Sequence, residues 1–302
     1  MNQFSNHPLY RKHDIESAMS SLWKFYKKKF VVLIVYSFLV SLLIQYLSLT
    51  FNFNELQTIT DPVEMMEKFR SLMWPMIGIL LINLFFTTVL HYYVIFNPVD
   101  SNTTIFSSFN KSLKFIVPYI ILMTLFVFFA SAAAIIGLVA LIVGVFFTML
   151  YVFTLGLFLL PLLMIEGPNI GNAISRSFRL THRNFWSNMG WVAVFILIIL
   201  VMSVILSSIV MLPFTGKFLK ILTNPEETVN ALDFMSNPVY LTLLSLVKAL
   251  TFPLMPIFAS ILYFNGKAGE EYNSVTPSGK EEQKVRVEDL YSKPGEDNQP
   301  EN

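Results

Sequence analysis

The 302-residue sequence contains no cysteine and only four histidines. The absence of cysteine excludes disulfides, thiolate metal sites, a cysteine nucleophile and lipid attachment through a thiol. The histidines, at positions 7, 13, 91 and 182, are not spaced as metal ligands are. Nucleophile motifs, glycine-rich phosphate loops and paired carboxylates within the apolar runs are also missing. We therefore expect a protein that is not an enzyme and that uses no metal or other cofactor.

Charge is also scarce. Charged residues make up 14% of the chain, the net charge is +1, and 54% of the residues are hydrophobic. The mean hydropathy of +0.59 lies outside the range of an ordinary soluble domain. The sequence therefore predicts an all-α polytopic membrane protein, and its balanced charge argues against a nucleic-acid partner.

Long apolar runs define the expected organisation. A flexible N-terminus (1–13) precedes a membrane domain (14–265), and a polar tail (266–302) is expected to be disordered. The first run begins only at Phe30, after a long polar lead, which favours an uncleaved span over a signal peptide. Six spans are predicted, at about 30–49, 73–95, 115–137, 143–165, 188–212 and 239–264.

Residues 115–165 are 51 consecutive positions without a charge. One straight helix of this length would measure about 76 Å, more than twice the hydrocarbon core. The run must contain a turn, for which we favour the segment between Gly137 and Gly144. Alternatively, the spacing of Ala133, Gly137, Ala140 and Gly144 is that of a small-residue packing stripe on one helix. Prolines within the spans, at 118, 161, 253 and 256, predict kinks or breaks.

Three basic, amphipathic stretches lie next to spans, near residues 14–29, 101–114 and 166–186. Each has apolar residues on one face and cations on the other, which is typical of helices lying on a membrane surface. We expect their cations to meet anionic phospholipid; the candidates are Lys24, Lys27, Lys28, Lys111, Lys114, Arg176, Arg179 and Arg183.

Lysine and arginine are unevenly distributed between the loops. Sixteen fall in the N-terminal segment, the second and fourth loops and the tail, whereas the first and fifth loops hold four and Lys248 lies inside the sixth span. The positive-inside rule then places both termini and the three surface helices in the cytoplasm of a bacterial inner-membrane protein.

Similar spacings recur along the chain and predict a three-fold repeat of a surface helix followed by a two-span hairpin. Ile15, Ala18 and Phe30 are spaced as Ile170, Ala173 and Phe185 are. The outer loops also correspond, since Thr60-Asp61-Pro62 matches Thr223-Asn224-Pro225 at a similar distance downstream. Asp14 and Asp61-Pro62 are in addition expected helix starts.

Short motifs add a resemblance to a family. The segments Pro161-Leu162-Leu163-Met164-Ile165-Glu166, Ala173-Ile174-Ser175-Arg176-Ser177-Phe178 and Asn184-Phe185-Trp186 resemble a pattern in uncharacterised six-span bacterial membrane proteins. These are similar to the membrane domain attached to some glycerophosphoryl diester phosphodiesterases. The resemblance implies an all-helical membrane protein without an established activity. The catalytic barrel of such enzymes would be a separate domain for which this chain has no room, so hydrolysis is not expected.

Four polar residues lie within or at the ends of spans: Lys248, Gln45, Asn83 and Glu166. Lys248 is the one charge deep in a span, so it either reaches the outer interface, contacts a lipid head group or serves transport. Glu166 is an expected ion-pair partner for Arg176 or Arg179. A scaffold or accessory role among envelope proteins is the first hypothesis, and a transporter or lipid-translocating protein is the alternative. The sequence leaves the oligomeric state open.

Overall fold

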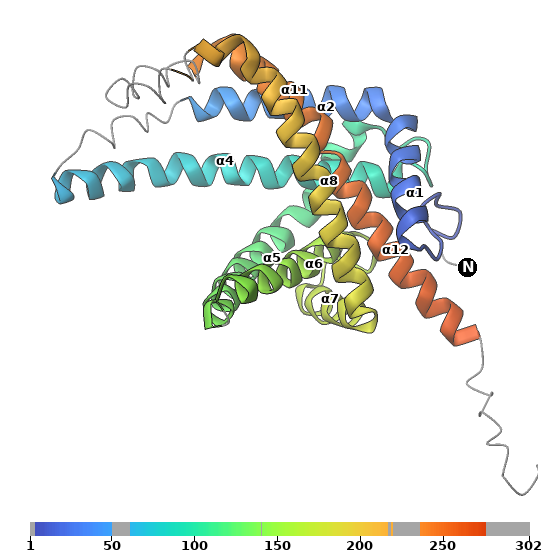
Figure 1. The fold of residues 1–302 in the computed structure, drawn as a ribbon. Coiled ribbons are helices and arrows are strands. Elements are labelled where there is room, and N and C mark those ends of the chain that lie inside the picture. Colours follow the sequence, from blue (N-terminus) through green and yellow to red (C-terminus); the bar gives the residue numbers. More distant parts are fainter. Residues whose placement is uncertain (1–3, 50–60, 140, 217–218, 220–235, 276–302) are drawn as a thin grey trace, which may run out of the picture.

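A computed structural model describes residues 4–49, 61–139, 141–216, 219 and 236–275, and its regular elements in these ranges are helices (Figure 1). In chain order these are α1 (Ile15–Lys28), α2 (Phe30–Ser48), α4 (Pro62–Phe96), α5 (Ile105–Val139), α6 (Leu141–Ile165), α7 (Ile170–Arg183), α8 (Phe185–Met211), the short 3-10 helix η1 (Leu212–Phe214), α11 (Pro238–Thr251) and α12 (Leu254–Val275).

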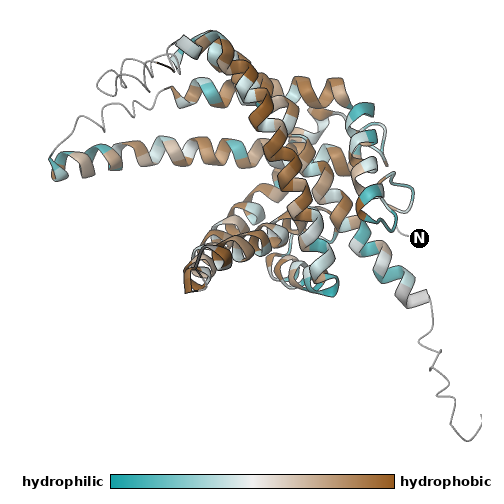
Figure 2. Cartoon of the chain, in the orientation of Figure 1, coloured by the Kyte–Doolittle hydropathy of each residue, from teal (hydrophilic) through white to brown (hydrophobic). Residues whose placement is uncertain are grey.

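Six of the described stretches are long and apolar enough to cross a membrane. They are Phe30–Ser48, Pro62–Phe96, Ile105–Val139, Val143–Ile165, Phe185–Phe214 and Pro238–Tyr272. In Figure 2 most of their length is brown, and teal residues gather at α1, at the end of α7 and at the end of α12. Large apolar side chains such as Val31 and Phe128 are more than two-thirds exposed, as expected for surfaces facing lipid. The chain is thus an all-helical, multi-pass membrane protein.

The centre of the molecule is the first half of α12. Between Leu254 and Phe264 most side chains are fully buried, and the helix packs against α1, α4 and α6. Phe258 stacks on Phe195 of α8 with ring centroids 4.0 Å apart. Since α12 contacts α1, α4, α6 and α8, it fixes the position of α1 relative to these long helices.

Helix starts follow the local chemistry expected from the sequence. The Asp14 side chain accepts a hydrogen bond from the Ser17 amide, and the Ser17 hydroxyl oxygen accepts one from the Asp14 amide, which forms a capping box. Asp61 caps α4 with Pro62 in the first turn. The matching Thr223-Asn224-Pro225 segment lies outside the described residues.

The turn between the third and fourth long helices falls where it was expected. The α5 helix ends at Val139 and α6 begins at Leu141, which rules out a stripe along one helix. Small residues still matter there, because a Cβ on Gly137 would lie 3.0 Å from Val145 Cα and 3.1 Å from the Gly144 carbonyl oxygen. Gly137 therefore permits the close approach of α5 and α6.

Three expectations differ from the structure. Residues 105–114 are not a separate surface helix; they form the start of the 35-residue α5, since nothing between Lys111 and Phe115 breaks the helix. Residues 4–13 are packed rather than loose, with Leu9 only 1% exposed. The last helix continues to Val275, nine residues beyond the expected start of the tail at residue 266.

The repeat stays a prediction. Helices α1 and α7 each have 14 residues and each is followed, after a single residue, by a long apolar helix. The middle unit has no separate counterpart to α1 and α7, because its basic segment is continuous with α5.

Of the four prolines expected to disturb spans, three lie inside helices and one lies at a break. Pro256 is in the first turn of α12. Pro118 and Pro161 lie inside the uninterrupted helices α5 and α6. Around Pro253, in contrast, the chain leaves helical geometry for two residues between α11 and α12. Proline has no backbone N–H to continue the helix, which accounts for the break.

Candidate functional site

A basic groove lies along α1. It has a volume of about 520 Å³ and is lined by residues of the N-terminal segment, α1 and the end of α4: Asn6, Pro8, Leu9, Arg11, Ser21, Lys24, Phe25, Lys28, Lys29, Asn97 and Pro98. Four of these side chains are cationic and none is acidic. The groove can therefore accept an anion without displacing an internal ion pair.

Burial of the N-terminal segment shapes one wall of this groove. His7 is 3% exposed, its Nε2 lies 3.3 Å from the Val94 carbonyl oxygen, and its Nδ1 accepts a hydrogen bond from the Leu9 amide. Its ring also lies 4.5 Å from that of Phe264 in α12. Burial lowers the pKa of His7 to about 4, with the Val94 contact acting in the opposite direction, so the ring is neutral near pH 7.

The α1 helix presents its cations outward. Leu22 and Tyr26 are buried on the opposite face, Phe25 is buried in the wall of the groove, and Lys24 and Lys28 are exposed at the groove. Arg11 donates to the Ser21 hydroxyl oxygen over 2.6 Å, which positions its guanidinium at the groove wall. Lys27 is exposed outside the groove lining.

The two lysines of the middle basic segment lie at the start of α5. The ammonium of Lys111 is 3.6 Å from Asp100 Oδ2, and both side chains are nearly half exposed. Lys114 is exposed and lies 4.9 Å from the centre of the Phe115 ring. Neither lysine lines the basic groove.

The second polar cluster surrounds Arg176 of α7. The guanidinium bridges two carboxylates: Nε and Nη2 donate to Glu166 over 3.0 and 3.1 Å, while Nη1 and Nη2 donate to Glu270 over 2.9 and 2.8 Å. The Arg176 side chain is 10% exposed, and those of Glu166 and Glu270 are 16% and 25% exposed. The expected pairing of Glu166 with Arg176 is present, but Arg176 points inward and not toward lipid.

Neighbouring groups complete this cluster. Lys267 lies 3.4 Å from Glu166 Oε1, and the Tyr263 hydroxyl donates to the same oxygen over 3.2 Å. Arg183 donates to the Gly266 carbonyl oxygen over 2.6 Å. Burial alone would raise the pKa of Glu166, but the hydrogen bonds and charge of Arg176, with the charge of Lys267, outweigh it and lower this pKa. The hydrogen bonds that Arg176 donates to Glu270 and Glu166 raise the pKa of Arg176, so the cluster is ionised at neutral pH.

Local structure holds Glu166, at the end of α6, close to Arg176 of α7. Gly167, with a φ of 109°, adopts a conformation that L side chains disfavour and turns the chain from α6 into α7 beside Glu166. The Ser177 hydroxyl donates to the Leu155 carbonyl oxygen over 2.8 Å, which ties α7 to α6. Asn188 donates to the Leu180 and Thr181 carbonyls and so satisfies the end of α7.

Sequence reasoning missed Glu270 and Lys267 because it assigned them to a disordered tail. The available signal was the spacing of Gly266 and Gly269 just after a span. A Cβ on Gly266 would lie 3.1 Å from Leu180, and one on Gly269 would meet the Arg183 guanidinium. These glycines therefore let α12 approach α7 closely enough for the ion pairs to form.

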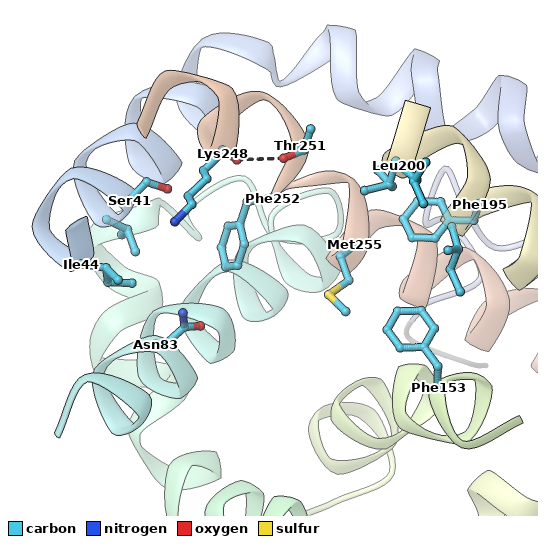
Figure 3. Close-up of a pocket in the computed structure, with 13 residues that line it drawn as sticks. Ser41, Ile44, Asn83, Phe153, Phe195, Leu200, Lys248, Thr251, Phe252 and Met255 are labelled. Carbon is cyan, nitrogen blue, oxygen red and sulfur yellow. Dashed lines mark hydrogen bonds between the residues drawn. The ribbon is translucent and has the colours of Figure 1, made fainter. Parts of the chain in front are cut away.

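The remaining candidates do not join either cluster. Arg179 is exposed on α7. Gln45 of α2 is buried, and its Nε2 has no hydrogen-bond partner among the described residues. Lys248 and Asn83 both line a cavity between the long helices (Figure 3). In the part of the chain that the structure describes, no three His, Asp or Glu side chains form a group able to hold a metal ion.

Helix lengths, lipid-facing surfaces and polar ends define the class, an integral membrane protein with six apolar helices. The model of the family described as the membrane domain of glycerophosphoryl diester phosphodiesterase matches residues 131–290, more than half of the chain. The chain belongs to this family. Comparisons with curated proteins and with solved structures gave no match.

Proposed function

We propose that the chain is a non-catalytic accessory or scaffold protein of the bacterial inner membrane that holds anionic phospholipid head groups in the basic groove of α1. The observation that carries the proposal is the set of four cations lining one groove without an acidic side chain. Each lysine or arginine near an anionic surface contributes about 1 kcal/mol of attraction. A phosphate in the groove would also gain charge-assisted hydrogen bonds from Lys24, Lys28 and Arg11.

The proposal narrows the set of lipid contacts expected from the sequence. Lys24 and Lys28 retain this role, joined by Arg11 and Lys29, whereas Lys27, Lys114 and Arg179 serve as weaker contacts outside the groove. Arg176 is assigned to the ion-pair cluster. Other envelope proteins are proposed partners that bind the polar surface around the basic groove.

A titration of the purified, delipidated protein with phosphatidylglycerol in an uncharged detergent tests the groove, with bound lipid counted by native mass spectrometry. Changing Lys24, Lys28 and Lys29 together to Gln is expected to weaken binding at least tenfold, since three nearby charges contribute about 3 kcal/mol. The matched control changes Lys27, Lys114 and Arg179 to Gln and removes the same charge. Equal losses in the two variants would show diffuse attraction and contradict a groove site.

Orientation is part of the same proposal, with both termini and the groove in the cytoplasm. The count of lysine and arginine by loop supports it. The absence of cysteine makes the test direct, because single cysteines at Lys27 and at Glu64 become the sole thiols. In intact cells an impermeant maleimide should label the Glu64→Cys variant and spare Lys27→Cys. The reverse labelling would overturn the orientation.

A second function, lipid translocation or transport, is favoured by one observation. Lys248 and Asn83, which come from helices far apart in the sequence, line a common cavity among the spans. Transport requires polar groups along a path between spans. Lys248 and Asn83 are two such groups in this cavity.

A further inference from the structure

Lys248 of α11 lines a cavity between the long helices, and no acidic side chain pairs with it among the described residues. The cavity has a volume of about 490 Å³ and is lined by residues of α2, α4, α6, α8, α11 and α12, together with the turn before α12: Val40, Ser41, Ile44, Asn83, Phe153, Phe195, Ile196, Ile199, Leu200, Lys248, Thr251, Phe252 and Met255. Lys248 is the only charged member of this lining. The site is therefore apolar with one cation.

Two nitrogen groups point into the same space. In Figure 3 the Lys248 ammonium and the Asn83 amide nitrogen extend toward one another from opposite walls. Asn83 uses its Oδ1 to accept from the Thr87 hydroxyl over 3.3 Å, which leaves its NH₂ group directed at the cavity. Ser41 adds a hydroxyl from α2. Donors thus outnumber acceptors, and an anion fits this arrangement.

The broken helix places Lys248 at this position. Lys248 lies ten residues after Pro238, about 15 Å along α11, and three residues before the helix ends. The Thr251 hydroxyl caps the Val247 and Lys248 carbonyls over 3.3 Å, and the Tyr26 hydroxyl of α1 binds the Leu250 carbonyl oxygen over 2.9 Å. Interrupted helices of this kind line substrate sites in membrane proteins because side chains and backbone there can face a cavity.

Lys248 is an exposed residue of α11, so its side chain lies beside this apolar lining and faces the membrane, where an ammonium is unfavourable unless an anion joins it. The remaining wall, with Ile44, Phe195, Leu200 and Met255, is suited to hydrocarbon. A ligand that satisfies both parts is an amphiphile with an anionic head. The cavity opens among lipid-facing helices, so a membrane lipid reaches it without crossing water.

We propose that this cavity is an intramembrane binding site for an anionic phospholipid, with its phosphate on Lys248 and Asn83 and acyl-chain carbons along α8 and α12. The site is separate from the groove of α1 and shares none of its residues. It does not depend on the proposed function of that groove.

Photo-crosslinking tests the site on the full chain reconstituted in nanodiscs. A phosphatidylglycerol with a diazirine near its head group should label peptides that carry 40–44, 195–200 and 248–255. Lys248→Met should reduce this labelling about tenfold or more, because one charge-assisted hydrogen bond contributes about 1.5–3 kcal/mol. Lys248→Arg should retain it, and Asn83→Leu should lower it several-fold while keeping a side chain of similar size.

Controls separate the cavity from the surface and from other lipids. The Lys24, Lys28 and Lys29 to Gln variant should keep cavity labelling, and a matching phosphatidylcholine probe should label the cavity at least fivefold less. Equal labelling of wild type and Lys248→Met, with both proteins monodisperse, would overturn the proposal. Equal labelling by the zwitterionic probe, or labelling by a diazirine fatty acid alone, would overturn it as well.

Discussion

Helices α1 and α7 have the same length and similar basic, amphipathic sequences, yet their cations have different surroundings. On α1, Lys24 and Lys28 face a groove without acidic residues. On α7, Arg176 is held between Glu166 and Glu270, which come from segments on either side of it in the sequence. A basic stripe alone therefore does not define a lipid contact. What decides is whether the rest of the chain supplies carboxylates at the same place.

The largest expected effect comes from removing the inward-facing arginine. Arg176→Gln leaves two partly buried carboxylates without their shared donor, which should cost about 2–3 kcal/mol of unfolding free energy, less than a fully buried pair because water reaches both acids. Arg176→Lys should recover only part of this, since an ammonium cannot bridge two carboxylates as a planar guanidinium does. Thermal unfolding in detergent measures both.

The exposed neighbour provides the control for that measurement. Arg179→Gln removes one charge from the same helix but no described ion pair. Its unfolding free energy should stay within about 0.5 kcal/mol of the parent value. If Arg179→Gln destabilised the protein as much as Arg176→Gln, the contrast between inward and outward cations would be lost.

The second largest effect is expected from lowering the pH, which should reduce the stability of the folded protein by protonating His7. The pKa of His7 is about 4 in the folded protein and 6.5 in a free side chain, so the unfolded chain binds more protons between these values. Stability from a neutral His7 is complete above pH 6.5 and decreases as the pH falls toward 4. The loss between pH 6.5 and pH 5 should be about 1.5 kcal/mol.

A His7→Gln variant separates this contribution. It keeps an amide able to hydrogen-bond Val94 but cannot titrate, so its stability should change less between pH 6.5 and pH 5. The stability of this variant should still change slightly with pH because of His13. Burial also lowers the pKa of His13. Identical pH profiles for parent and variant would show that His7 does not hold the groove wall through its neutral form.

Glu166 should act in a lower pH range. Its pKa lies below the ordinary value of 4.5, so the stability it contributes is present above that pH and is lost as the pH falls through the folded-state pKa. Glu166→Gln should therefore flatten the melting profile below pH 4.5 and leave the His7 range unchanged. An altered slope between pH 6.5 and pH 5 in this variant would contradict the assignment.

The smallest effect is expected at the exposed pair of Lys111 and Asp100. Solvent screens these charges and the side chains are nearly half exposed, so Lys111→Gln should leave the melting temperature unchanged within error. A clear decrease would show that exposed pairs also hold these helices, which would weaken the contrast with Arg176.

Much of the fold follows from the sequence because a bilayer imposes simple constraints. Long apolar runs define the six spans, and the caps at Asp14 and Asp61 follow from local hydrogen bonding. The pairing of Glu166 with Arg176 could also be predicted from the sequence, since the two residues lie on either side of a short turn. These features depend on neighbours in the sequence.

Features that depend on distant contacts were not predictable in this way. The polar composition after Asn265 suggested a tail, but contacts of Gly266 with Leu180 and of Glu270 with Arg176 accompany continuation of the helix to Val275. The groove could not be predicted from the sequence either. Its lining includes Arg11 of the N-terminal segment, and this segment is held in place by the burial of His7 against Val94. Tertiary contacts override local composition at both places.

Two variants measured for two properties test the central contrast most directly. The Lys24, Lys28 and Lys29 to Gln variant should lose phosphatidylglycerol binding at least tenfold and keep its melting temperature within about 2 °C. Arg176→Gln should keep lipid binding within about threefold and melt about 5 °C lower or more. An Arg176→Gln protein that melts normally but loses phosphatidylglycerol binding would contradict the division between a lipid groove on α1 and an internal ion-pair cluster on α7.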